Sequence, residues 1–161
     1  MGQSYQPEAR SPDARGKKII LLTRQPLDTE AVTASVCDNA NGAAVTFLGV
    51  TRNETGGRRV LYLEYEAYQE MAEKLLGRIA DEIRDRWSIR DVAIVHRFGR
   101  LEIGEVSLVV AIGSPHRGEA FAACQYAVDR IKQDVPIWKK EVFEDGEVWV
   151  GTETERHSTT A

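Results

Sequence analysis

The stretch VSLVVAIGSPHRGEAFAACQYAVDRIKQDVPIWKKE, residues 106–141, decides the fold. Its first part, 106–113, is apolar and predicts a strand, and residues 114–134 predict a helix. Ser114 can cap this helix and Pro115 suits its first turn. Pro136 disfavours helical geometry at the residue before it, so the helix should end near Val135 and an extended segment should follow.

Outward from this stretch, strand-like and helix-like segments alternate. We expect strands at 17–23, 42–51, 60–68, 92–99 and 106–113, helices at 26–40, 69–87 and 114–134, and a final hairpin over 139–151. Asp28 is the expected N-cap of the first helix. Strand 60–68 should form a hairpin with 42–51, and LEIGE (101–105) should be the turn between the next two strands. This order predicts an α+β domain with a mostly antiparallel sheet and three main helices.

Two of the helices carry an apolar stripe that should face the core. In the helix 69–87 the stripe recurs every four residues, at Met71, Leu75, Ile79, Ile83 and Trp87. In the helix 114–134 it comprises Phe121, Cys124, Val128 and Ile131.

Length and composition bound the class of protein. The 161 residues suit one domain, which we place at 17–151 between polar tails at 1–16 and 152–161 that we expect to be disordered. The net charge of −4 argues against a general nucleic-acid binder, although it permits a local basic pocket. No apolar run approaches the roughly 20 residues that span a bilayer, and no signal sequence is recognisable, so we expect a cytoplasmic protein.

The cysteines and histidines do not suggest a metal site or a cofactor. Cys37 and Cys124 lie far apart and form no CxxC motif. His96, His116 and His157 lack the spacing of metal ligands. We therefore expect no metal and no bound cofactor, and we expect His96 to be packed in the structure.

A first candidate site is the start of the helix at 114–134. His116 and Arg117 stand where free backbone N–H groups and the helix dipole favour an anion. The guanidinium of Arg117 suits phosphate or carboxylate. The alternative is a solvated first helical turn with a partly packed histidine.

A second candidate is Arg52, which follows the buried strand 42–51 and opens a glycine-containing loop. Binding residues are common in such loops. The alternative is that Arg52 only contributes surface charge.

The third candidate is the pair Lys132 and Lys139, on either side of Pro136. The turn at the proline would let Lys139 approach Lys132, and an uncharged amine can attack an acyl carbon or act as a base. The alternative is simpler, because a cation such as Lys132 suits the end of a helix and Lys139 can be a solvated charge. The neighbouring Lys140 is expected to be solvated.

Five motifs, in this order, resemble a known family. They are TFLGVTRN (46–53), LEYEAY (63–68), HRFGRLEIGE (96–105), the stretch 114–141 and WVG (149–151). Together they cover roughly residues 18–151 and resemble the large, catalytic subunit of molybdopterin synthase.

The resemblance implies a sulfurtransferase of molybdenum cofactor biosynthesis with an α/β hammerhead fold. Its substrate would be cyclic pyranopterin monophosphate (precursor Z), which receives two sulfurs to form the molybdopterin dithiolene. The sulfur donor would be a small ubiquitin-like subunit whose C-terminal Gly-Gly carries a thiocarboxylate. The large subunit would dimerise and bind one small subunit at each end, giving a heterotetramer.

The resemblance also implies roles for particular residues. Lys132 and Lys139 match the two essential lysines, with Lys132 nearer the thiocarboxylate and Lys139 facing the pterin. Arg52, His116 and Arg117 match substrate-binding residues, the last two across the dimer interface. Glu141 matches the acidic residue that follows the second lysine. A lysine could stabilise an oxyanion, polarise the substrate or form a transient adduct, and the sequence does not choose among these.

Two other classes of protein compete with this interpretation. One is a non-catalytic α+β module that binds an anionic metabolite through the same basic residues. The other is a structural dimerisation domain in which the lysines are only surface charge.

Overall fold

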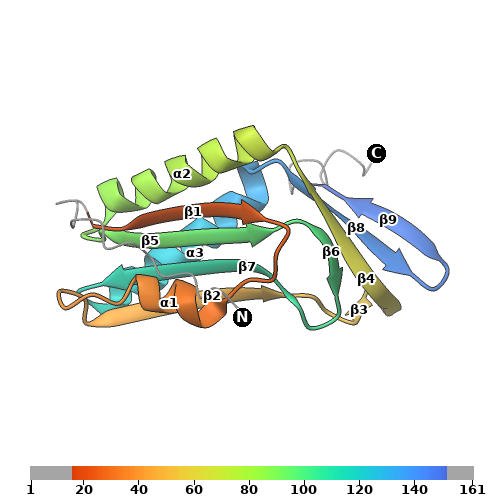
Figure 1. Cartoon of the computed structure of the whole chain (residues 1–161), viewed down its shortest axis with the longest axis horizontal. Helices are drawn as coiled ribbons and strands as arrows, with labels where there is room; N and C mark the ends of the chain where they lie inside the picture. Colours follow the sequence, from red (N-terminus) through yellow and green to blue (C-terminus); the bar gives the residue numbers. More distant parts are fainter. Residues whose placement is uncertain (1–15, 152–161) are drawn as a thin grey trace, which may run out of the picture.

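Two β-sheets meet at one end of the molecule, and three helices pack on the first of them (Figure 1). The computed structural model describes residues 16–151. The elements are β1 (Lys18–Thr23), α1 (Thr29–Ser35), β2 (Ala43–Val50), β3 (Glu54–Thr55), β4 (Arg58–Ala67), α2 (Gln69–Arg86), β5 (Asp91–Arg97), β6 (Gly99–Glu102), β7 (Val106–Ser114), α3 (Arg117–Asp134), β8 (Ile137–Phe143) and β9 (Gly146–Val150). The predicted α+β class, its three helices and its mostly antiparallel pairing are confirmed.

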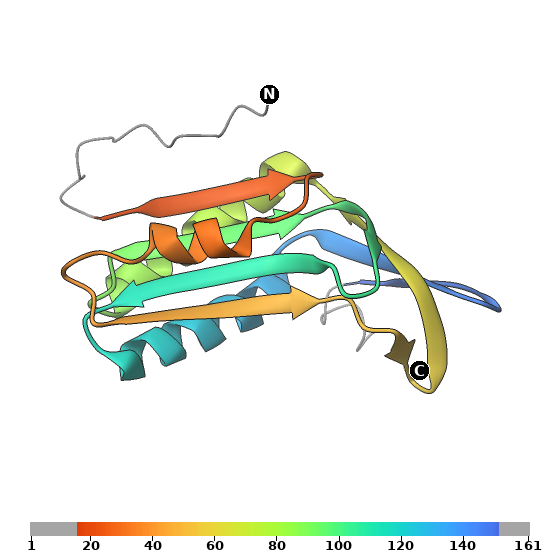
Figure 2. The same cartoon turned by 60° about the horizontal axis from the view of Figure 1, so that its bottom comes forward.

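The first sheet has the strand order β1-β5-β7-β2. Only the β1–β5 pair is parallel in this sheet, and the other two pairs are antiparallel. Helices α2 and α3 cover one face and α1 covers the other (Figure 2). The main core lies between the sheet and the two long helices, and a small cluster of Val36, Ala93 and Ala111 lies on the α1 side. Burial on both faces explains why β5 and β7 are almost continuously apolar.

The second sheet has the order β3-β4-β8-β9, and β6 also pairs with β4. The prediction that 60–68 forms a hairpin with 42–51 is wrong, because β2 pairs with β7 and β4 pairs with β8. Strand β2 stays in the first sheet because Ala43, Val45 and Phe47 pack into the main core. The turn at Gly56-Gly57 does form, but it joins β4 to the two-residue strand β3.

The expectation that LEIGE (101–105) is only a turn is also wrong. Its first two residues complete β6, which pairs with β4 of the second sheet. Leu101 is fully buried there, which explains why the chain crosses to the second sheet between β5 and β7. The final hairpin, β8 with β9, is confirmed.

The cap of α1 and the end of α3 agree with the prediction, whereas α1 (Thr29–Ser35) is shorter than the predicted helix 26–40. Asp28 caps α1 by accepting a hydrogen bond from the N–H of Ala31 at 2.9 Å, as predicted. Helix α3 ends at Asp134, and Val135 is extended, as Pro136 requires. Ser114 does not cap α3, because it ends β7 and its hydroxyl accepts from the N–H of His116.

Each apolar stripe contains one misplaced residue. Phe121 is 63% exposed and Met71 is 50% exposed, so neither belongs to the core. Many of the side chains that face the core are small, because α2 and α3 lie close to the sheet and to each other. The buried residues are Ala72, Leu76, Ile79, Ala80 and Ile83 in α2, and Ala120, Ala123, Cys124, Ala127, Val128 and Ile131 in α3.

His96 is buried in β5, as expected for a packed residue. Its ring lies edge-on to the ring of Tyr65, with 5.3 Å between centroids. Its Nδ1 lies 2.8 Å from the carbonyl oxygen of Arg97, so this nitrogen carries the proton and donates. Burial lowers the pKa of His96 to about 4, and the imidazole is neutral near pH 7.

We expect the buried His96 to make the fold acid-sensitive. Its pKa is about 4 when folded and 6.5 ordinarily, so between these values only the unfolded chain binds the proton. The free energy of unfolding should therefore fall by about 3 kcal/mol as the pH falls from 6.5 to 4. Urea denaturation at several pH values measures this loss. In His96→Phe, which keeps a ring but cannot titrate, the pH dependence over this range should be much flatter, and equal slopes in both proteins would contradict the prediction.

The remaining predictions about the chain as a whole concern its ends and membranes. Residues 1–15 and 152–161, which hold almost all of the two predicted tails, lie outside the described residues. Within residues 16–151, no helix is long and apolar enough to cross a membrane.

Candidate functional site

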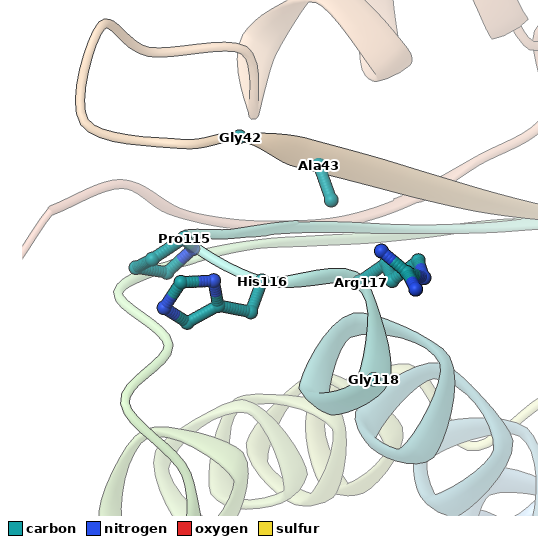
Figure 3. A pocket seen from close by; sticks show the side chains of 6 residues that line it. All are labelled: Gly42, Ala43, Pro115, His116, Arg117 and Gly118. Atoms are coloured by element: carbon teal, nitrogen blue, oxygen red, sulfur yellow. The ribbon is translucent and has the colours of Figure 1, made fainter.

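A shallow cavity of about 420 Å³ lies at the start of α3 (Figure 3). We call it the helix-start pocket, and its lining residues are Gly42, Ala43, Pro115, His116, Arg117 and Gly118. Figure 3 shows His116 just before α3 and Arg117 at the start of that helix, close to where β2 begins. Gly42 permits this close approach, because a Cβ there would lie 2.6 Å from the carbonyl oxygen of Pro115.

The helix-start pocket has the chemistry of an anion site. The side chains of His116 and Arg117 are exposed, and no side chain caps α3. The first N–H groups of the helix lack partners within it, and the helix dipole is positive at this end. A guanidinium beside such a helix start suits phosphate oxygens.

The second group of candidate residues lies at the other end of the molecule, where the two sheets meet; we call this place the junction. Arg52 is exposed and comes directly after β2, following the buried Thr51. Lys132 is exposed in the last turn of α3. Lys139 lies on β8, which begins just beyond that helix end. We call these three residues the junction group.

Lys139 is held by a buried carboxylate. Its amine lies 3.2 Å from Oε1 of Glu141, two residues further along β8, and its side chain is 26% exposed. Glu141 itself is buried, and its Oε1 is also 3.5 Å from the hydroxyl of Thr55. A buried carboxylate needs such partners, because removing its charge from water is costly. Lys139 is therefore a positioned cation with limited freedom, rather than a mobile surface lysine.

Lys140 points to the opposite face of β8 and differs from the prediction of a solvated charge. Its amine contacts Glu64 at 2.8 Å and Glu147 at 3.3 Å. The hydrogen bond with Glu64, more than that with Glu147, raises the pKa of Lys140. Neighbouring side chains of a strand point to opposite faces. Lys139 therefore belongs to the junction group, whereas Lys140 contacts residues of β4 and β9 on the other face of the second sheet.

The fold separates the two groups of candidate residues. Strands β2 and β7 are antiparallel, so Arg52 follows the end of β2 that is remote from His116. Helix α3 starts at the helix-start pocket and ends at the junction (Figure 2). Its 18 residues span about 27 Å at 1.5 Å per residue. Within one chain, no phosphate-sized ligand can touch both groups.

Three residues at the junction had no role in the sequence analysis. Tyr65 stands directly opposite Lys139 in the β4–β8 pairing, Thr55 contacts Glu141, and Ser107 lies on β7 nearby in the first sheet. Strand alternation places Tyr65 on one face of β4, but no local pattern reveals that this face meets another sheet. Within residues 16–151, no group of three or more His, Cys, Asp or Glu side chains is arranged to hold a metal.

Comparisons with known proteins agree with the fold and the motifs. Residues 22–134 match the family model described as MoaE protein. The chain is 49% identical over 141 residues to the molybdopterin synthase catalytic subunit of Halalkalibacterium halodurans, covering 88% of this chain and 90% of that protein.

Two solved structures are also similar to this chain. A crystal structure of molybdopterin synthase from Staphylococcus aureus is similar with a TM-score of 0.79 and 44% identity, over 84% of this chain and 98% of that one. A complex of subunits 1 and 2 of molybdopterin-converting factor from Helicobacter pylori shares the fold, with a TM-score of 0.68 and 21% identity, over 81% of this chain and 89% of that one.

Proposed function

Because the chain belongs to the MoaE protein family, we propose that it transfers sulfur from a thiocarboxylated small subunit to cyclic pyranopterin monophosphate. It is the catalytic subunit of a molybdopterin synthase and a sulfurtransferase. The structural observation that carries the proposal is the half-buried Lys139, held by the buried Glu141 at the junction. A lysine that a buried carboxylate holds in one position suits a catalytic role. This observation therefore favours an enzyme over a module that only binds an anion.

Lys139 and Lys132 are the catalytic residues in this proposal. In each transfer the thiocarboxylate sulfur forms a bond to a side-chain carbon of the pterin and displaces an oxygen substituent from that carbon. Water then adds to the acyl carbon and the donor's carbon–sulfur bond breaks, so that the donor leaves as a carboxylate. Negative charge develops on the acyl oxygen during the cleavage, and a fixed ammonium group stabilises it. The ion pair with Glu141 supports this role for Lys139 over a role as a nucleophilic amine, which would have to be uncharged. Lys132 is exposed, which suits contact with an incoming protein tail.

The helix-start pocket binds the phosphate of the substrate, and Arg52 contributes a further positive charge beside the lysines. One chain cannot bring these parts together, because about 27 Å separates the ends of α3. We therefore propose that a complete site combines the junction group of one protomer with the helix-start pocket of a second. A two-fold dimer would contain two such sites, and the small subunit would bind at each junction. The two-subunit complex from Helicobacter pylori supports a protein partner of this kind.

A mixed dimer tests both the reaction and the shared site. Arg117→Ala and Lys139→Ala should each be nearly inactive alone. Co-expressed in equal amounts, they should recover up to about one quarter of the wild-type activity, because random pairing leaves one intact site in half of the dimers. Dithiolene formation is measured with precursor Z and purified, thiocarboxylated small subunit.

Two results would contradict these assignments in different ways. If the wild-type chain forms no dithiolene in this assay, the proposed reaction is wrong. If the wild type is active but the co-expressed variants remain as inactive as either variant alone, the site lies within one protomer. Co-expression of Arg52→Ala with Lys139→Ala is the matched control, since both residues belong to the junction group. That pair should not recover activity.

A further inference from the structure

The backbone on either side of Arg52 is held by hydrogen bonds. Before it, the N–H of Thr51 donates to the carbonyl oxygen of Glu105 at 3.0 Å, and its carbonyl oxygen accepts from the N–H of Gly104 at 2.9 Å. After it, the carbonyl oxygen of Asn53 accepts from a backbone N–H of β4 at 2.9 Å. Since Gly104 and Glu105 lie in the turn between β6 and β7, the place of Arg52 depends on where this turn is held.

The carboxylate of Glu105 holds the turn in two places. Its Oε1 accepts from the N–H of Glu102 at 2.8 Å, which closes the turn on itself. Its Oε2 accepts from Nη1 of Arg97, the last residue of β5, at 2.6 Å. The hydrogen bond from Glu102, more than that from Arg97, lowers the pKa of Glu105, so the group is ionised near pH 7. Hydrogen bonds between ionised groups are stronger than those between neutral groups.

The guanidinium of Arg97 contacts both sheets. Its side chain is only 12% exposed. Besides the bond to Glu105, its Nε donates to the carbonyl oxygen of Arg24, just beyond β1, at 3.3 Å. Its Nη2 donates to the carbonyl oxygen of Arg100, in β6, at 3.5 Å. The turn that holds Thr51 is therefore anchored to the ends of strands from both sheets by one nearly buried side chain.

A second ion pair in the same segment lacks this connection. Nε of Arg100 lies 2.6 Å from Oε1 of Glu102, so this pair is as short as that of Arg97 with Glu105. Both of its side chains are more than half exposed. Within residues 16–151, the carboxylate of Glu102 has no hydrogen bond other than the one from Arg100. The pair thus offers a matched control for the pair that anchors the turn.

We propose that Arg97 and Glu105 are positioning residues for substrate binding, which fix the backbone at Thr51 and thereby the place of Arg52. The inference rests on the proposed function, in which Arg52 contributes a positive charge to the site. Neither positioning residue touches the substrate. They determine the place from which the guanidinium of Arg52 reaches it.

Glu105→Ala should weaken substrate binding more than it slows the chemical steps. Alanine removes both contacts of the carboxylate, so the turn and Thr51 are no longer held against β5. We expect KM for precursor Z to rise about fivefold and kcat to change by less than about twofold, because Arg52 binds substrate and the two lysines stay in place. Glu105→Gln, which keeps an acceptor for the N–H of Glu102, should raise KM less.

A double variant shows whether Glu105 acts through Arg52. When Glu105→Ala is added to Arg52→Ala, the residual kcat/KM should fall by less than about a further twofold, because the group that Glu105 positions is already absent. A residue that only stabilised the fold would cause its full loss in either background. Single-turnover assays can follow the low rates of both variants.

Hydrogen exchange of backbone amides tests the same connection without the reaction. The amides of Thr51 and Gly104 should exchange at least about tenfold faster in Glu105→Ala than in the wild type, because this segment opens more easily. The matched control is Glu102→Ala, the same truncation in the same segment. It should leave these exchange rates, KM and kcat within about twofold of wild type, since it removes an exposed ion pair.

Four results would overturn the inference: a wild-type KM in Glu105→Ala, a full loss when Glu105→Ala is added to Arg52→Ala, unchanged exchange at Thr51, or equal effects of Glu102→Ala and Glu105→Ala. A failure of the proposed function would look different. If the wild type forms no dithiolene, the proposed reaction is wrong and this inference falls with it. If Arg52→Ala is impaired while Glu105→Ala is not, only the positioning role is wrong.

Discussion

Lys139→Ala should lower the rate of dithiolene formation by two to three orders of magnitude, roughly the cost of removing one preorganised group that stabilises an oxyanion. The structure gives this lysine little freedom, because its amine is 3.2 Å from the carboxylate of the buried Glu141. Alanine removes the cation from the place where charge develops and leaves Glu141 with the hydroxyl of Thr55 as its remaining contact. Single-turnover assays with thiocarboxylated small subunit and precursor Z measure the effect on the chemical steps.

The control for this prediction is the adjacent lysine. Lys140→Ala also removes one positive charge from β8, but it does so on the opposite face, where Lys140 pairs with Glu64 and Glu147. Its rate should stay within about threefold of wild type, because Lys140 lies on the face of β8 opposite to Lys139. Equal losses in Lys139→Ala and Lys140→Ala would point to net charge or folding rather than catalysis. Thermal unfolding of both variants shows whether either loss comes from a damaged fold.

Gly113→Ala should destabilise the protein by about 3 kcal/mol or more, the upper range for overpacking a well-packed interior. A Cβ at position 113 would overlap the carbonyl oxygen of Val36 and lie 2.6 Å from Nδ2 of Asn41. Neither neighbour can move easily. Asn41 donates to both Val36 and the buried Asp91, and Asp91 also accepts from the N–H of Lys17. Urea denaturation measures the loss of stability.

Gly77→Ala is the matched control, because it makes the same chemical change in the middle of α2. The atom closest to a Cβ there is the amine of Lys18, at 3.9 Å, which is an ordinary contact. Alanine favours the helix over glycine, so this variant should gain about 0.5–1 kcal/mol. If Gly113→Ala were as stable as wild type, the contact between β7 and the end of α1 would have to be looser than the structure shows.

Much of the fold could be predicted because it depends on local patterns. Residue type and spacing suffice for Asp28 as a cap, for the end of α3 before Pro136 and for the hairpin of β8 and β9. Apart from the failed cap at Ser114 and the length of α1, the errors concern contacts between distant segments. Phe121 continues an apolar pattern, yet it is exposed because the sheet contacts a face of α3 built largely from alanines. Similarly, the sequence around Leu101 predicts a turn, but in the structure this residue is buried in a strand of the second sheet.

The candidate site, too, could be predicted from the sequence only in part. The sequence by itself determined the kinds of group available: His116 and Arg117 at a helix start, where the chemistry suits an anion, and two lysines on either side of a proline. These depend on side-chain chemistry and on near neighbours in the chain. Only the tertiary structure decided where the groups lie, because β2 pairs antiparallel with β7 and α3 spans the length of the first sheet. It also decided that Lys139 stands opposite Tyr65, since the pairing of β4 with β8 joins residues that are far apart in the chain.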